Sequence, residues 1–262
     1  MQTHCKLITA IIVIMIGVVS SGICKEAQVE LKYMVPGGKI EETIKNLQID
    51  VMKPTDTRVV CFYDTASRDL FNHKPQVILR SRYSTSGKQE SDITVKIRGA
   101  TVSISGARRE FDQVIGREMV ESWSLTSKPQ TQVGIKNANN GIGIRKLFNK
   151  DQEKFIRETQ NRVDWDGLIP FGPVIGVKMW NLTSIAGLRS ITVERWELPE
   201  AAGKPKRVLF EVSTKVPVSN VANARMALST ALGFELVAGP DAETKTKLVM
   251  EHFSKFSRWR SQ

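Results

Sequence analysis

The sequence predicts an all-β-dominated α+β fold: an eight-stranded antiparallel β-barrel that closes into a tunnel and carries flanking helices. Three observations predict it. Segments rich in Val, Ile, Phe and Tyr recur from residue 27 to residue 217 and are separated by turn residues. Charged residues fall on one face of several of these segments. A sheet with this many strands must cover its edges, and closing into a barrel removes them.

The first predicted strands are each bounded by turn residues. Residues 27–35, AQVELKYMV, alternate charged with apolar side chains and end at Pro36, after which a helix is predicted over residues 39–48. The next three predicted strands are residues 57–65 (TRVVCFYDT), 76–84 (QVILRSRYS) and 92–99 (DITVKIRG). Each is rich in β-branched or aromatic residues, which favour a pleated, half-buried surface.

The second half of the chain adds four strands and three helices. The strands are predicted at residues 117–125, 173–182, 189–198 and 206–216, and the helices at residues 149–163, 219–234 and 241–259. The helix over 219–234 opens at a Ser or Asn cap and ends at Gly233. Residues 127–144 are rich in Gly and Asn, which predicts a loop. Residues 23–262 are therefore predicted to form a single tunnel domain with C-terminal helices.

Like charges stand two residues apart on neighbouring predicted strands. Arg80 and Arg82 form one such pair, and Lys96 and Arg98 form the next. Because strand side chains alternate between faces, the members of each pair share a face. A solvent-exposed outer face would give this pattern, and so would a cationic lumen built to hold a polyanion. The formal net charge of +11 favours an anionic partner.

The basic, aromatic stretch over residues 252–262 raises the question of nucleic-acid binding. An anionic membrane surface is another possible partner, but we favour a solvated helix end as the explanation of this composition. We therefore predict no specific nucleic-acid partner.

Residues 1–22 are typical of a signal peptide. An apolar run over residues 7–22 follows Lys6 and ends in small residues at Gly22. The apolar part is shorter than the roughly 20 residues of a membrane-spanning helix. We therefore predict cleavage after Gly22, a secreted or periplasmic protein, and no transmembrane span afterwards. A membrane anchor and a lipoprotein attached through Cys24 are the alternatives.

Two cysteines remain after such a cleavage, Cys24 and Cys61. In an oxidising compartment two cysteines can form at most one disulfide, so we predict a possible Cys24–Cys61 bridge. Neither belongs to a CxxC pair, and the histidines are far apart in the sequence. Zinc binding and thiol catalysis therefore have no supporting set of residues.

Short motifs follow one another along the predicted strands in a distinctive order. QVELK, with Glu30 and Lys32, opens the first strand, and Tyr63-Asp64-Thr65 closes the second. The paired arginines, a Thr94-x-Lys96 motif, the basic Lys178 and the acidic Glu211 follow on later strands. This order resembles that of the CYTH superfamily, the triphosphate tunnel metalloenzymes that include CyaB-type adenylate cyclases and thiamine triphosphatases. The resemblance covers about residues 27–235 and implies an eight-stranded tunnel.

The resemblance also implies a site and a chemistry. A phosphorylated or polyphosphate small molecule would be held by cationic side chains, because Arg offers paired donors to phosphate oxygens and Lys a point charge. The implied phosphate-binding residues are Lys32, Arg80, Arg82, Lys96, Arg98 and Lys178. Hydrolysis would use Mg²⁺ or Mn²⁺, with Glu30 and Glu211 as catalytic acids and Glu30, Glu211 and Glu118, or Glu121, as metal ligands.

The sequence departs from the family pattern at two acidic positions. Gln28 and Ser213 stand where the family has glutamates, so each acidic pair has lost one member. Two fewer negative charges weaken a divalent-metal site. Three hypotheses therefore stay open: a metal-dependent triphosphate hydrolase, a catalytically impaired protein that binds a phosphorylated or other anionic ligand, and a lipocalin-like barrel for an apolar ligand.

Overall fold

The structure is a computed structural model that describes residues 27–87, 90–102, 104–129, 131–159, 162–200, 205–238 and 242–254. The predicted signal peptide, residues 1–22, lies outside this part of the chain. Cys24 does as well, so its pairing with Cys61 stays a prediction. No helix within the described ranges is long and apolar enough to cross a bilayer.

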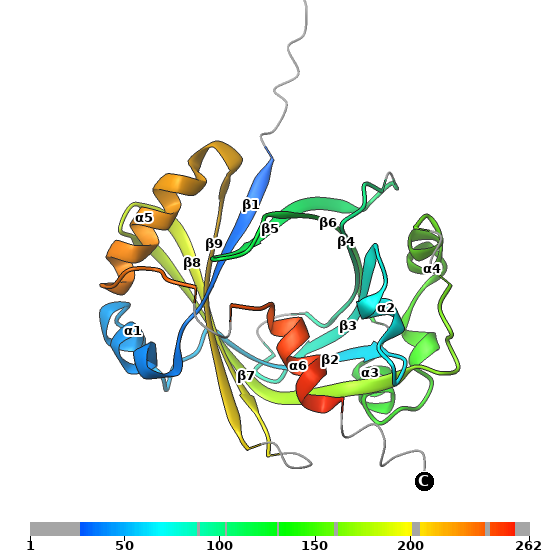
Figure 1. The fold of residues 1–262 in the computed structure, drawn as a ribbon. Helices are drawn as coiled ribbons and strands as arrows, with labels where there is room; N and C mark the ends of the chain where they lie inside the picture. The colour runs from blue at the N-terminus through cyan, green and yellow to red at the C-terminus, as the bar shows by residue number, and fades with distance from the viewer. Residues whose placement is uncertain are drawn as a thin grey trace, which may run out of the picture.

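The described strands form one closed barrel, in the order β1-β5-β6-β4-β3-β2-β7-β8-β9 (Figure 1). Their bounds are β1 Gln28–Met34, β2 Asp56–Asp64, β3 Gln76–Ser84, β4 Asp92–Arg98, β5 Arg108–Val114, β6 Val120–Ser127, β7 Ile169–Ile185, β8 Leu188–Leu198 and β9 Arg207–Pro217. The prediction of a closed, β-dominated barrel with flanking helices is confirmed.

The predicted number of strands and their uniform antiparallel pairing are wrong. The described barrel has nine strands, and β1 and β5 run parallel, with Val29 opposite Phe111 and Lys32 opposite Val114. Strand β5 was not predicted, because both of its faces carry polar or charged residues. RREFDQV shows none of the apolar alternation by which a strand is recognised.

Most of the helices cover the outside of the barrel, and the last one packs against residues inside it. The α-helices are α1 Ile40–Asn46, α2 Asp69–Asn72, α3 Gln132–Asn139, α4 Lys150–Arg157, α5 Val221–Leu232 and α6 Lys245–Phe253, and the 3₁₀ helices are η1 Gly37–Lys39, η2 Ile144–Leu147 and η3 Val218–Asn220. Helix α3 lies where a loop was predicted. It begins because the Thr131 hydroxyl accepts a hydrogen bond from the Gly134 amide, and it buries Ile135 and Ala138.

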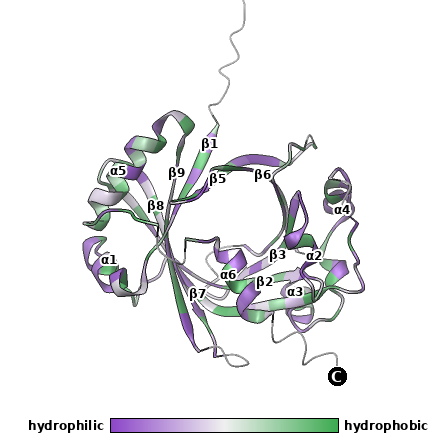
Figure 2. Cartoon of the chain, viewed as in Figure 1, coloured by the Kyte–Doolittle hydropathy of each residue, from purple (hydrophilic) through white to green (hydrophobic). Residues whose placement is uncertain are grey.

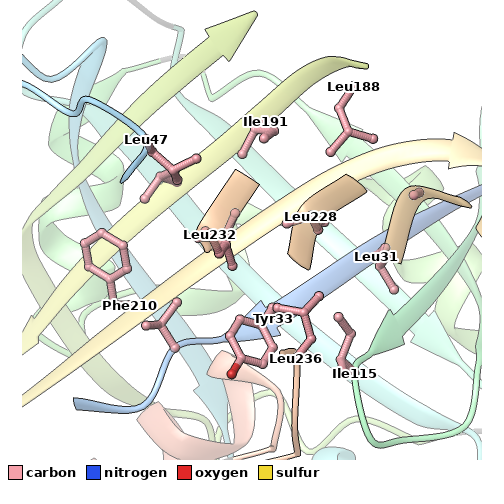
Figure 3. Packing of buried hydrophobic residues seen from close by; sticks show 14 of the residues in the cluster. Leu31, Tyr33, Leu47, Ile115, Leu188, Ile191, Phe210, Leu228, Leu232 and Leu236 are labelled. Carbon is pink, nitrogen blue, oxygen red and sulfur yellow. The ribbon is translucent and has the colours of Figure 1, made fainter. Parts of the chain in front are cut away.

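Two apolar layers form the outer core of the barrel. On one side, Leu228 and Leu232 of α5 pack against Leu31 of β1 and Phe210 of β9 (Figure 3). On the opposite side, helices α2, α3 and α4 cover β2, β3, β4 and β6. Because successive residues of a strand alternate faces, filling the outside with apolar residues turns the charged residues inward. Figure 2 shows this mixture of hydrophilic and hydrophobic residues along the strands.

A third apolar cluster lies inside the barrel, next to α6. Val60 and Phe62 of β2, Ile78 of β3 and Trp196 of β8 pack there with Leu248 of α6. Helix α6 also contacts β7. The lumen therefore has an apolar end beside α6 and a charged part beyond it.

We expect Leu228→Ala to lower the free energy of unfolding by roughly 2–5 kcal/mol, because it removes a fully buried side chain between α5 and the barrel. Met226 lies on the same helix but is 63% exposed, so Met226→Ala should change stability by less than about 0.5 kcal/mol. Urea denaturation followed by circular dichroism measures both. Equal losses in the two variants would contradict the outer core described above.

Candidate functional site: a charged cavity in the barrel

The lumen holds a cavity of about 530 Å³. Seven of the predicted site residues line it: Glu30, Lys32, Arg80, Arg82, Lys96, Arg98 and Glu211. They come from β1, β3, β4 and β9. The charged face of these strands is therefore turned into the barrel rather than toward solvent.

Strand register brings the two cationic pairs together. On β3 and β4, Arg80 stands opposite Thr94 and Ile78 opposite Lys96. Arg80 and Lys96 are therefore diagonal neighbours on the inward face. At this spacing two long side chains can reach the same bound group. The register explains why residues 16 apart in the sequence line one wall.

Two predicted residues lie elsewhere. Glu118 is exposed in the turn between β5 and β6, and Lys178 lies between Val177 and Met179, the two β7 residues that line the cavity. Alternation therefore directs Lys178 away from the lumen. The alternative metal ligand Glu121 also lies elsewhere, since its carboxylate binds Arg109, 2.7 Å away.

Asp112 of β5 is at the centre of the largest ion-pair network. Its carboxylate lies 2.7 Å from the Lys32 ammonium, 2.5 Å from the Lys96 ammonium and 3.5 Å from the Arg98 guanidinium. The Glu30 carboxylate lies 3.0 Å from the Lys32 ammonium as well. Asp112 was not among the predicted site residues because its strand was not predicted. The one signal in the sequence is its spacing of two residues from Glu110, which would place both acids on one face of a strand.

Two further aspartates hold the arginines of the cavity. Asp92 of β4 accepts hydrogen bonds from Arg82, with its Oδ2 2.9 Å from the Arg82 Nε, and Asp56 lies 2.6 Å from the Arg58 Nε. Arg80 is the least compensated of these cations. Its nearest carboxylate oxygen, on Asp92, is 3.9 Å away, and its Nε has no hydrogen-bond partner among the described residues.

Lys245, the first residue of α6, reaches into the cavity from the end of the lumen where α6 packs. Its ammonium contacts the carboxylates of Glu194 and Glu211, which stand opposite each other on β8 and β9. It also lies 5.2 Å from the centre of the Trp196 ring. The sequence analysis missed Glu194 and Lys245, because no motif marked them and α6 follows the last strand.

Carboxylates neutralise most of the cationic lining. Within the described ranges, nine cationic side chains and four glutamates line the cavity. The cations are Lys32, Arg58, Arg80, Arg82, Lys96, Arg98, Arg108, Lys215 and Lys245, and the glutamates are Glu30, Glu110, Glu194 and Glu211. Asp56, Asp92 and Asp112 pair with cations of this set. Cations thus outnumber carboxylates by two when all are ionised.

The surroundings shift the pKa values of the lining groups. Burial, together with the nearby Lys32 ammonium, lowers the pKa of Lys96 to about 8. Burial would raise the pKa of Glu30, but the surrounding cations Lys32, Lys215 and Lys96 together outweigh it and bring that pKa to about 2. Burial and the neighbouring Arg82 lower the pKa of Arg80 to about 10. At pH 7 these groups carry their charges, and Lys96 is the nearest to losing its own.

The carboxylates do not fit the predicted metal site. Glu30 stands opposite Lys215 on β9, four residues along from Glu211, so the two predicted ligands are well separated along the strand. Each is already paired with a lysine, at 3.0 Å and 2.9 Å respectively. The described residues hold no group of three or more His, Cys, Asp or Glu placed to bind a metal ion. Hard divalent cations need several free oxygen ligands, which these acids do not supply together.

Asp112→Asn is expected to lower the free energy of unfolding by roughly 3–5 kcal/mol, because it leaves three largely buried cations without their shared carboxylate. The exposed Glu118 offers a matched control, and Glu118→Gln should change stability by less than about 0.5 kcal/mol. Urea titration at low ionic strength compares them, because urea is uncharged and does not screen the ion pairs. A loss in Asp112→Asn no larger than in the control would show that the network contributes nothing.

Comparison with known proteins shows a shared fold. No protein-family model matches the sequence, and no curated protein matches it at a significant level. A Hippeastrum protein, described as an adenylyl cyclase with a dominant triphosphatase activity, aligns with 86% of this chain and 95% of its own, at 12% identity and a TM-score of 0.55.

Two further solved structures align over similar lengths. A Pyrococcus horikoshii protein covers 86% of this chain and 98% of its own, at 13% identity and a TM-score of 0.39. A Vibrio parahaemolyticus protein, described as an adenylate cyclase, covers the same shares at 14% identity and a TM-score of 0.37. At these identities the first likeness shows fold alone. The chain therefore shares its overall fold with the Hippeastrum protein.

Proposed function

We propose that the barrel binds a small anion rich in phosphate groups, of the tripolyphosphate type. The observation that carries the proposal is the convergence of Lys32, Arg80, Arg82, Lys96 and Arg98 on one cavity. A volume of about 530 Å³ lies within the range of small-molecule sites. Grouping like charges in a partly enclosed space costs free energy, which an anionic ligand offsets.

Arg80 is the central contact in this proposal. Its guanidinium has donors left over, since its Nη2 reaches Thr94 at 3.4 Å and its Nε has no partner among the described residues. Planar guanidinium groups bind phosphate oxygens through paired hydrogen bonds. The lysines around Asp112 are more fully compensated and would add charge rather than direct hydrogen bonds.

Hydrolysis of the bound anion is the second candidate. The triphosphatase activity described for the Hippeastrum protein favours it. Glu30 and Glu211 are the acids predicted for it, and Mg²⁺ or Mn²⁺ is the predicted cofactor, for which these two carboxylates do not supply a joint site. Both acids are ion-paired with lysines, which is why binding without turnover is our first choice. A charged lining of this kind does not suit an apolar ligand.

Purified protein is expected to bind tripolyphosphate, and Arg80→Ala is expected to weaken binding at least about tenfold, because charge-assisted hydrogen bonds to a phosphate are lost. Isothermal titration calorimetry in EDTA measures both affinities. Lys178→Ala, a change to a lysine outside the cavity, is the matched control and should bind as the wild type does.

Phosphate release in Mg²⁺ or Mn²⁺ separates the two candidates. Turnover abolished by Glu30→Gln would select hydrolysis, and binding without turnover would select our first choice. Wild-type protein that neither binds nor hydrolyses tripolyphosphate would overturn both.

The affinity should fall as the pH rises through about 8. Lys96 has a pKa of about 8 in the ligand-free protein, so it is charged below that pH and neutral above it. The bound anion favours the charged form, and binding near pH 8 should therefore take up protons. Calorimetry in two buffers of different ionisation enthalpy measures this uptake.

Lys96→Arg keeps its charge over the whole range and is the control for the pH dependence. Tripolyphosphate itself also titrates in this range. Because that effect is the same for both proteins, it cancels when their affinities are compared at each pH. If the affinities of the two proteins change in parallel between pH 7 and about 9.5, the charge of Lys96 does not contribute to binding of the anion.

A further inference from the structure

Lys245 occupies a position that local structure disfavours. It is the first residue of α6, where the helix dipole and unpaired backbone amides repel a cation. Its side chain is nonetheless turned into the barrel and is 15% exposed. Interactions with the barrel, rather than with its own helix, must therefore hold the ammonium in place.

The partners of Lys245 are two acids that repel each other. Glu194 and Glu211 are directly opposite on β8 and β9, a spacing at which like charges destabilise a sheet. Their side chains are 18% and 3% exposed. Glu211 also has a buried carboxylate oxygen, Oε2, with no hydrogen-bond partner in the part of the chain that is described. Two carboxylates this close together favour a cation between them. The single ammonium of Lys245 leaves the Glu211 Oε2 without a hydrogen bond among the described residues.

Several contacts fix the ammonium between the two acids. The Trp196 indole lies beside it at 5.2 Å and donates a hydrogen bond of 2.8 Å to the Glu194 Oε2. Helix α6 is capped by the Thr244 side chain and packs Leu248 into the apolar end of the lumen. Arg117 donates a 2.8 Å hydrogen bond to the carbonyl of Ala242, just before the helix. Lys245 is thus built into the site.

We infer that Lys245 takes the place of a divalent cation at the Glu194–Glu211 pair, so that the barrel holds its anion without a metal ion. Two carboxylates together with phosphate oxygens are a common ligand set for Mg²⁺ and Mn²⁺. Here an ammonium joined to the chain supplies the positive charge between the acids. The statement about the acids stands on the contacts above, whereas the statement about the anion rests on the proposed function.

Replacing the ammonium by a neutral side chain should therefore create a metal site. In Lys245→Met, we expect Mn²⁺ to bind at least tenfold more tightly than in the wild type, as measured on the purified full chain by the electron paramagnetic resonance signal of free Mn²⁺. Lys247→Met is the matched control, since this lysine lies on the same helix, pairs with Glu243 and does not line the cavity. Adding Glu194→Gln to Lys245→Met should remove the gain.

Folding of the variants is part of the test. Lys245→Gln, which keeps a hydrogen-bond donor, should show the same gain, and Mn²⁺ should raise the melting temperature of either variant but not of the wild type. Mn²⁺ affinity in both variants equal to that of Lys247→Met would overturn the inference. So would variants that stay unfolded with Mn²⁺ present, because the ion is expected to replace the lost charge.

Binding of tripolyphosphate by the wild type tests separately whether the barrel holds its anion without a metal ion. Binding in EDTA supports this part of the inference. Binding that requires Mg²⁺ or Mn²⁺ would overturn the inference but leave the proposed function standing. The absence of binding in every buffer would overturn the proposed function and leave the Mn²⁺ result of Lys245→Met unaffected.

Discussion

The pairing of inward-facing cations with carboxylates is the constraint on which the rest of this barrel depends. The outer faces of the strands are filled by apolar residues that pack under the helices, so the charged faces are forced into the lumen. A charge removed from water without a partner costs several kcal/mol. Asp112, with three cations around it, is the clearest case of the compensation that this arrangement requires.

The same pairing decides which cations remain available to a ligand. Lys32, Lys96 and Arg98 are held in position by Asp112, whose carboxylate balances part of their positive charge. Arg80 is less well balanced, because its nearest carboxylate oxygen is 3.9 Å away. The cavity therefore combines a rigid, compensated part with a part that still has free donors. Such pre-organisation lowers the entropy lost when a ligand binds.

Much of this arrangement was predictable from the sequence, because alternation along a strand is a local property. Eight strands and the shared face of Arg80 and Arg82 followed from it. Long-range pairing did not: Asp112 lies on a strand without apolar alternation, and Lys245 reaches the lumen from a helix beyond the last strand. Lys178 was assigned to the site by the resemblance of its strand to a basic strand of the family, but its neighbours Val177 and Met179 line the cavity, so Lys178 faces the other way.

The parallel contact between β1 and β5 has a topological consequence. Strands around a closed ring can alternate in direction throughout only if their number is even, so a ring of nine needs a seam where two neighbours run the same way. Deleting β5 would join β1 to β6 in opposite directions and remove the seam. Asp112 lies on this same segment, so the strand that makes the number of strands odd also supplies the carboxylate that three cations of the lumen share.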